Sequence, residues 1–139
     1  MVNLPMIRAS ELDFESDLVY MYQGEPFTGV AYEDSPTLGR SEVMYSSGLQ
    51  DGSSRDWYPS GKVKSEMMFA RNDRHGGYRN YDEAGRVVEE GVYEYSVLVS
   101  RVLFDSAGNI VEEFNIDLDG GTGRILQRLR NERGWKLDE

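Results

Sequence analysis

Residues 42–69 of the chain read EVMYSSGLQDGSSRDWYPSGKVKSEMMF, and residues 66–93 read EMMFARNDRHGGYRNYDEAGRVVEEGVY. The second stretch repeats the pattern of the first at a distance of 24 residues. Aromatic and glycine positions carry the agreement, in the pairs Tyr45 and Phe69, Gly52 and Gly76, Trp57 and Tyr81, and Gly61 and Gly85. A fixed period of this length predicts tandem structural repeats.

Each unit is predicted to contain two strands and two turns. In residues 62–69, Val63, Met67 and Phe69 alternate with Lys62, Lys64 and Glu66, which is the period of a half-buried strand. Residues 54–58 and 78–81 are predicted return strands. Residues typical of turns follow at Asn72-Asp73 and His75-Gly76-Gly77, and at Pro59-Ser60-Gly61 and Glu83-Ala84-Gly85. The expected fold class is all-β: one elongated antiparallel meander of hairpin repeats over residues 22–116, in a single domain of residues 1–139.

The third unit departs from this pattern. Where the second unit has Asn72-Asp73, the third has Tyr95-Ser96-Val97-Leu98-Val99, a run of strand-forming residues without the usual turn residues. One interpretation is a longer buried strand, or a strand covered by the C-terminal helix. The other is an exposed apolar strand at Val97, Leu98 and Val99 that docks a partner.

The segment before the repeats carries a regular charge pattern. Residues 11–21 are predicted to form an N-terminal strand with Leu12, Phe14, Leu18 and Tyr20 on one side. Glu11, Asp13, Glu15 and Asp17 would then line its open face. Charged edge strands commonly block aggregation, so the stripe has a purely protective interpretation. The alternative is a docking stripe for a basic partner.

The segment after the repeats is predicted to be helical. Gly120-Gly121 precedes a helix over residues 122–133, with Thr122 as a candidate cap, Ile125, Leu126 and Leu129 as an apolar stripe, and Gly134 as its end. We expect this helix to pack over the last repeats and shield the end of the sheet.

The repeat also resembles a known family. The pattern of glycine, aromatic residue, Gly-(Lys/Arg)-Val, glutamate and a second aromatic residue is similar to the variant MORN repeat of bacterial YwqK-type antitoxin proteins. The residues that carry the resemblance are Gly52, Trp57, Tyr58, Gly61, Lys62, Val63, Glu66, Phe69, His75, Gly76, Tyr81, Gly85, Arg86, Val87 and Tyr93. It covers about residues 18–116. The resemblance implies an antitoxin or immunity protein that binds and neutralises a toxin encoded beside it.

Composition and charge narrow the class of partner. The chain has no run of about 18 apolar residues, no signal-peptide pattern and no cysteine, which favours a cytoplasmic protein. Residues 1–121 hold 10 Lys/Arg against 22 Asp/Glu, a net charge of −12. Such an acidic body repels nucleic acid and anionic membranes and attracts a basic protein. Acidity that serves only solubility is the alternative.

Catalytic chemistry finds little support in the sequence. His75 is the single histidine, and it is expected to lie in a repeat turn. Asp117-Leu118-Asp119-Gly120 is similar to the start of a calcium loop, but Arg128 stands where the loop requires glutamate. We therefore expect no catalytic, cofactor-binding or metal-binding residues.

The sequence as a whole predicts a binding protein. We expect an antitoxin that neutralises a basic toxin, for example a nuclease or a deaminase, by stoichiometric contact. The candidate contact residues are Glu11, Asp13, Glu15, Asp17, Val97, Leu98 and Val99. The alternative is a MORN-repeat scaffold or assembly module with no toxin partner.

Overall fold

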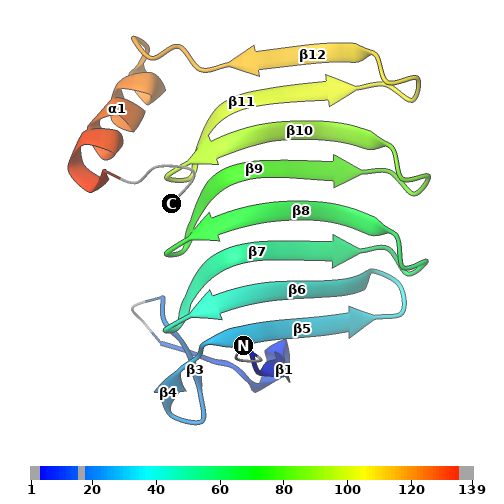
Figure 1. Cartoon of the computed structure of the whole chain (residues 1–139), viewed down its shortest axis with the longest axis vertical. Coiled ribbons are helices and arrows are strands. Elements are labelled where there is room, and N and C mark those ends of the chain that lie inside the picture. The colour runs from blue at the N-terminus through cyan, green and yellow to red at the C-terminus, as the bar shows by residue number, and fades with distance from the viewer. Residues whose placement is uncertain (1–3, 16–17, 135–139) are drawn as a thin grey trace.

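The computed structural model describes residues 4–15 and 18–134. Their main feature is a nine-stranded sheet in the order β1-β5-β6-β7-β8-β9-β10-β11-β12 (Figure 1). Its strands are β1 (Met6–Arg8), β5 (Gly29–Ser35), β6 (Gly39–Ser46), β7 (Leu49–Trp57), β8 (Val63–Ala70), β9 (Asp73–Tyr81), β10 (Val87–Glu94), β11 (Val97–Phe104) and β12 (Ile110–Asn115). A 3-10 helix, η1 (Ala9–Glu11), follows β1, and a small sheet contains β2 (Asp13–Phe14), β3 (Tyr20–Tyr22) and β4 (Glu25–Pro26). One α-helix, α1 (Gly121–Arg133), comes last.

The expected mostly-β fold with a C-terminal helix is confirmed: strands make up 57% of the structure and helix 12%. The sheet is mixed rather than purely antiparallel, because β1 pairs in parallel with β5. From β5 to β12 every pairing joins sequence neighbours in antiparallel orientation. After β1 the chain forms the small sheet and then returns to the large sheet as β5. Because β5 lies directly beside β1 and runs in the same direction, this pair is parallel.

Two-residue turns connect the strands at one end of the sheets. Both residues of each turn have positive φ, as the tight hairpins that match strand twist require. These turns are Gln23-Gly24, Ser47-Gly48, Arg71-Asn72 and Tyr95-Ser96. The predicted turn at Asn72-Asp73 is therefore displaced by one residue. The prediction of a continuous strand through Tyr95-Ser96 is wrong, because these two residues adopt the hairpin conformation without a glycine or asparagine.

His75-Gly76-Gly77 was expected to form a turn, but it lies inside β9. Gly76 has a φ of 125° and sits at a register shift between β8 and β9. A Cβ added there would lie 3.0 Å from the Cβ of Met68, so close approach to the neighbouring strand also favours glycine. The glycines at this position therefore correspond to a β-bulge rather than to the predicted turn.

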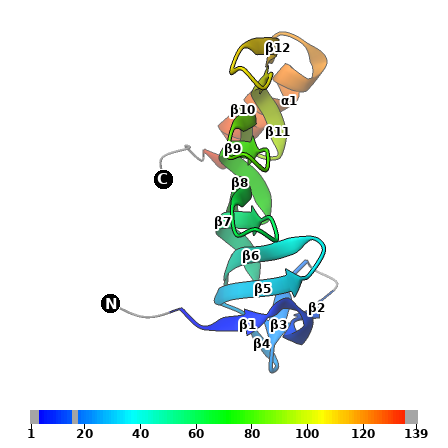
Figure 2. The same ribbon diagram turned by 90° about the vertical axis from the view of Figure 1, so that its right-hand side faces the viewer.

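The molecule is thick at its ends and thin between them. Figure 2 views the large sheet from its side and shows a single layer of strands between the small sheet and α1. The hydrophobic core lies at the N-terminal end, where Ile7, Phe27, Ala31 and Tyr45 are buried. Leu12, Tyr20, Tyr22 and Val43 pack against this cluster. The small sheet therefore supplies the second layer that the repeats lack.

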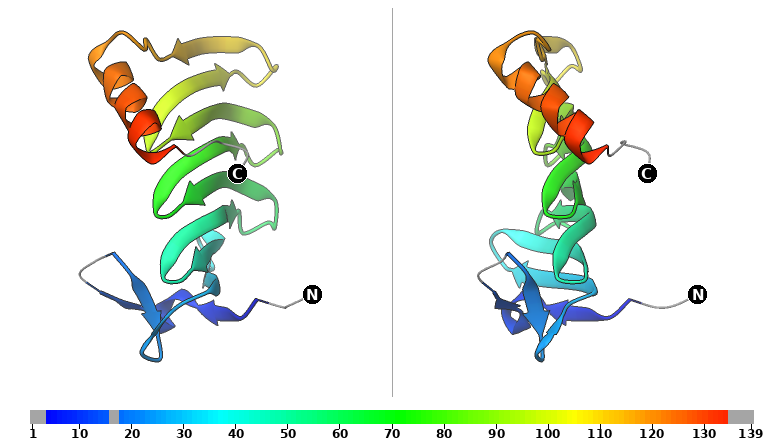
Figure 3. Two further views of the ribbon diagram at one scale, coloured as in Figure 1. Left: turned by 60° about the vertical axis from the view of Figure 1, so that its left-hand side comes forward. Right: turned by 90° about the vertical axis from the view of Figure 1, so that its left-hand side faces the viewer.

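Helix α1 runs back along the turn-bearing ends of β9, β10 and β11 (Figure 3). Leu126 is fully buried, and Arg130 donates two hydrogen bonds to the Glu94 carboxylate, at 2.8 and 2.6 Å. Arg133 donates to Asp73 at 2.6 Å. The helix has Gly120 as its N-cap rather than the predicted Thr122, and it ends at Gly134, whose φ is 67°. Among the described residues, no helix is long and apolar enough to cross a membrane.

The predicted N-terminal strand over residues 11–21 is wrong. Glu11 belongs to η1, where its carboxylate accepts a hydrogen bond from the Arg8 backbone N–H at 3.0 Å. Leu18 has a φ of 64°, and the Glu15 N–H donates to the Val19 carbonyl, so the chain reverses between β2 and β3. Local capping and this tight turn outweigh the alternating pattern.

Candidate protein-binding face

A row of alternating charges crosses one face of the large sheet. Register places Glu42 on β6 opposite Arg55 on β7, and Arg55 opposite Glu66 on β8. Glu66 in turn lies opposite Arg79 on β9, and Arg79 opposite Glu90 on β10. We call these five residues the charge ladder. Side chains opposite each other in neighbouring strands share a face, so the ladder is one continuous strip.

Two ion pairs lie within the ladder, one between β7 and β8 and one between β9 and β10. Arg55 Nε lies 3.4 Å from Glu66 Oε2, and Arg79 Nε lies 3.2 Å from Glu90 Oε2. The two arginine side chains are 52% and 59% exposed, and exposed pairs contribute only about 0–1 kcal/mol to stability. We therefore expect the ladder to contribute little to folding stability, and its charges remain accessible to another molecule.

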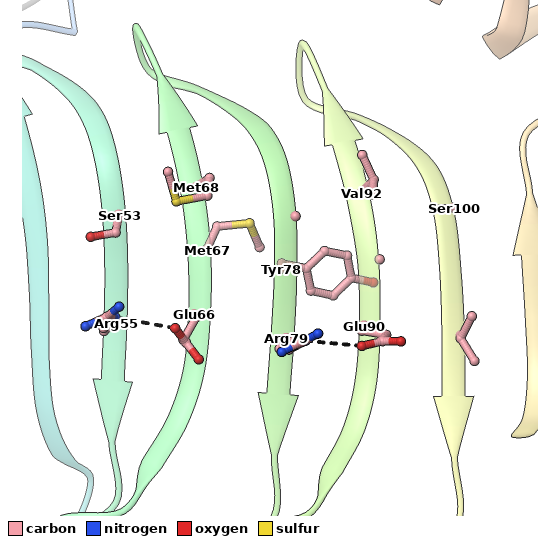
Figure 4. A pocket seen from close by; sticks show the side chains of 13 residues that line it. Ser53, Arg55, Glu66, Met67, Met68, Tyr78, Arg79, Glu90, Val92 and Ser100 are labelled. Carbon is pink, nitrogen blue, oxygen red and sulfur yellow. Dashed lines mark hydrogen bonds and ion pairs between the residues drawn. The ribbon is translucent and has the colours of Figure 1, made fainter. Parts of the chain in front are cut away.

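A second row lies beside the ladder on the same face, with apolar side chains at Met68 and Val92 and small residues at Ser53, Gly77 and Ser100; we call it the apolar row. Ser53 lies opposite Met68, and Val92 lies between Gly77 and Ser100. Figure 4 shows this row above the charged row, each crossing from β7 toward β11. Met68 is 41% exposed, and Gly77 contributes no side chain between it and Val92. The apolar row and the ladder residues other than Glu42 line an open groove of about 520 Å³ that spans the five strands from β7 to β11.

A hydrogen bond and an ion pair orient the ladder's central carboxylate, Glu66. The Tyr81 hydroxyl donates to Glu66 Oε1 at 2.7 Å, so Glu66 accepts from Tyr81 while it pairs with Arg55. This hydrogen bond is the main reason that the pKa of Tyr81 is raised. The Glu66 carboxylate is thus oriented by two neighbouring strands, as a recognition group would be.

The opposite face has a different polar arrangement. Tyr78 is 5% exposed, and its hydroxyl donates to Glu89 at 2.7 Å. Burial, followed by this contact with Glu89, raises the pKa of the Tyr78 phenol. The Tyr78 ring packs over Gly91, where a side chain would clash: an added Cβ would lie 2.6 Å from Tyr78 Cε1. This packing stabilises the thin middle of the sheet, where Tyr78 and Gly91 also border the groove.

Across residues 4–15 and 18–134, no cluster of three or more histidine, cysteine, aspartate or glutamate side chains is arranged to hold a metal ion. His75 is 7% exposed inside β9, and its Nδ1 accepts a hydrogen bond from the Tyr95 N–H at 3.0 Å. Burial lowers the pKa of its imidazole. It therefore acts as a packed acceptor for a turn.

The predicted acidic stripe does not form. Glu11 lies in η1, Asp13 in β2 and Glu15 in the turn that follows, while Asp17 lies outside the described residues. Glu11, Asp13 and Glu15 are all exposed, but they do not share one strand face.

Val97, Leu98 and Val99 begin β11, directly after the Tyr95-Ser96 turn. All three are half-buried, and β11 is paired on both sides, with β10 and with β12. Backbone docking of a partner strand at these residues is therefore blocked.

The sequence did contain a signal for the ladder. Glu42, Glu66 and Glu90 stand 24 residues apart, as do Arg55 and Arg79. The repeated aromatic and glycine positions indicate packing, whereas charges repeated at the same spacing indicate an exposed strip. Their spacing alone would have indicated one charged strip, given a constant register.

Comparison with known proteins gives no family. No family model matches the chain, and no curated protein is similar to it in sequence. Among solved structures, accessory secretory protein 1, 2 and 3 of Streptococcus pneumoniae matches with 11% identity and a TM-score of 0.38, over 84% of this chain and 20% of that chain. A mutant of S. aureus TarM, in complex with fondaparinux, alpha-GlcNAc-glycerol and UDP, matches with 12% identity and a TM-score of 0.43, over 77% and 21%. The chain spans about a fifth of the length of these structures.

Proposed function

We propose that the chain is a tandem array of MORN-like hairpin units. The two-residue turns support this proposal, since they recur at residues 23–24, 47–48, 71–72 and 95–96. The equal spacing of Glu42, Glu66 and Glu90 in the charge ladder supports it independently. A stack of equivalent units naturally presents an extended face with repeating side chains, which suits binding to a protein.

We further propose that the protein is an antitoxin or immunity protein, which neutralises a cognate toxin domain by stoichiometric binding. The observation that carries this proposal is the open groove of the charge ladder and the apolar row. It spans five strands, is not enclosed, and combines exposed charges with an apolar strip, as protein interfaces do. The surplus of acidic residues favours a basic toxin, because opposite charge accelerates encounter.

A rescue experiment tests the function. The reading frame beside this gene is expressed alone and together with this chain, and cell survival is measured. We expect toxicity alone and survival on co-expression, with a 1:1 complex recovered from the surviving cells. Survival that needs far less than one copy of this chain per toxin would indicate turnover and contradict stoichiometric inhibition. A neighbour that is harmless by itself would favour the alternative, a scaffold or assembly module.

A matched pair of variants tests the groove. Glu66→Lys with Glu90→Lys reverses two charges of the ladder, and we expect at least a tenfold slower association with the toxin at low salt. Glu25→Lys with Glu83→Lys makes the same change in net charge at exposed positions outside the ladder. Equal slowing by both pairs would show that overall charge, rather than the groove, guides the partner. Unchanged unfolding curves would verify that each pair leaves the fold intact.

A further inference from the structure

The two outer strands of the large sheet differ in length and exposure. At one edge, β1 is a strand of three residues, and the chain continues from it directly into η1. At the other edge, β12 is six residues long and every one of its residues is exposed. Within the described residues β12 pairs with β11 alone, and α1 lies at the ends of the strands rather than along this edge (Figures 1 and 3).

The exposed strand has only part of the usual protection against edge pairing. Natural edge strands are kept short or carry charges, proline or bulges that discourage another strand. β12 has a register shift at Val111 and carries two glutamates, but residues 112–115 keep a regular register and contain neither lysine nor proline. β12 reads IVEEFN, and Ile110, Val111 and Phe114 are 56%, 61% and 40% exposed. Large apolar side chains on a long open edge are the features that favour strand addition.

We propose that the open edge of β12 accepts an extended segment of a basic partner protein as a tenth strand. Main-chain hydrogen bonds would provide affinity, because alternate N–H and C=O groups of an edge strand point away from the sheet. Residue alternation then gives specificity. Glu113 lies opposite Val102 on one face, while Glu112 and Phe114 lie opposite Leu103 and Arg101 on the other.

Charge selects a basic segment as the occupant. Glu112 already pairs with Arg101 at 2.9 Å, whereas Glu113 has no ion pair among the described residues. A lysine or arginine opposite Glu113 would supply the missing charge, and an apolar residue would cover Phe114.

The same charges disfavour a second copy of this chain. When two β12 strands pair antiparallel along their whole length, Glu112 of each copy lies opposite Glu113 of the other. Like charges directly opposite each other destabilise a strand pair, and this register would contain two such pairs. A different chain with alternating basic residues avoids both.

A peptide titration tests the edge itself. The probe is an octapeptide that alternates lysine with valine, and the control probe alternates glutamate with valine. We expect saturable binding of the lysine peptide, slower hydrogen exchange in β12, and at least tenfold weaker binding of the glutamate peptide. N-methylation of alternate lysine-peptide amides, in the phase that faces β12, should abolish binding. Binding that protects the central groove instead of β12, or equal binding of both peptides, would overturn the proposal.

Variants of the full chain test which residues of β12 determine peptide binding. Glu113→Lys should reverse the preference, so that the glutamate peptide binds more tightly than the lysine peptide. Asn115→Pro removes a backbone donor: the Ile116 N–H donates to β11, so that of Asn115 faces outward. The Asn115→Pro variant should therefore bind both peptides more weakly. Glu83→Lys, on the turn between β9 and β10, is the control and should change neither. An unchanged preference in the Glu113→Lys variant would count against charge selection at this edge.

This inference rests on the proposed function only for the identity of the partner. If the neighbouring reading frame encodes a toxin, the Asn115→Pro variant should protect cells less well than the Glu83→Lys variant, provided that both remain folded. Full protection by Asn115→Pro would overturn the edge as the toxin contact and leave the antitoxin function standing. A harmless neighbour combined with lysine-peptide binding would overturn the antitoxin function and leave the edge site standing.

Discussion

The two ends of the molecule are stabilised by different interactions. At the N-terminal end, Phe27 and Tyr45 are 3% and 8% exposed, and their ring centroids lie 5.8 Å apart. At the C-terminal end, α1 buries Leu126, forms the Glu94–Arg130 and Asp73–Arg133 pairs, and places the Arg133 guanidinium over the Tyr95 ring. The first end is an aromatic core between two sheets, whereas the second is a helix attached by a buried leucine and by polar contacts of its arginines.

This difference indicates a division of roles. A single-layer sheet buries little apolar surface in its middle, so most of the stabilising burial has to come from its ends. The aromatic core secures β5 and β6 and the edge beside them. The helix secures the hairpin turns of β9 to β11 but leaves β12 open. We therefore expect the N-terminal end to set global stability and the C-terminal end to open locally.

The largest effect is expected in the aromatic core. Phe27→Ala should lower the free energy of unfolding by about 3–5 kcal/mol, since it empties the space between the small sheet and Tyr45. Urea denaturation followed by fluorescence measures the loss. Phe14→Ala, at a ring that is 55% exposed, is the matched control and should cost clearly less. Equal losses of unfolding free energy in the two variants would contradict the assignment of Phe27 to the core and of Phe14 to the surface.

A smaller and more local effect is expected at the helix. Leu126→Ala should cost about 2–3 kcal/mol at the helix contact, because the side chain is fully buried. Hydrogen exchange should then accelerate in α1 while β5 and β6 keep their protection. Ile125→Ala, one residue away and 50% exposed, is the control. Acceleration throughout the large sheet would contradict independent opening of the two ends.

The ion pair should contribute less than the buried leucine. Arg130→Met leaves the Glu94 carboxylate, which is 11% exposed, without its guanidinium. A fully buried pair would cost more, but Arg130 is 38% exposed, so solvent reduces the expected loss to about 1–2 kcal/mol. Arg128→Met, on the exposed side of the same helix, should change stability within experimental error. A matching loss at Arg128 would show that helix propensity or net charge, rather than the pair, is responsible.

Much of the fold follows from the sequence because repeats and side-chain alternation report local geometry. The predicted helix over residues 122–133 agrees with α1 to within a residue at each end, since Gly134 provides a left-handed end. The turn at Tyr95-Ser96 was not predicted, because tyrosine and the valines and leucine that follow favour strands, and neither turn residue is glycine or asparagine. Here their positive φ is stabilised by tertiary contacts, including the bond from the Tyr95 N–H to His75.

The site was harder to predict than the fold. The acidic stripe assumed one strand over residues 11–21, and an η1 hydrogen bond from Arg8 to Glu11 was enough to break it. The charge ladder depends on the register of five strands, which alternation within one strand does not give. The open edge at β12 depends on where α1 packs, because the same helix laid along β12 would have covered it.

The smallest effect is expected from pH, at the histidine beneath the Tyr95 turn. Burial lowers the pKa of His75, although the nearby carboxylates of Glu94 and Asp73 oppose this shift. Below a pH of about 6.5 the unfolded chain binds a proton that the folded chain resists, so stability falls as pH falls. Exclusion of one proton from the folded chain between roughly pH 7.5 and 5.5 costs at most about 1.4 kcal/mol, so we expect the loss of stability to stay below this limit. His75→Gln can still accept from Tyr95 but does not titrate, so its urea midpoint should fall less over this range. Identical pH slopes for the two proteins would show that another group couples the turn to protons.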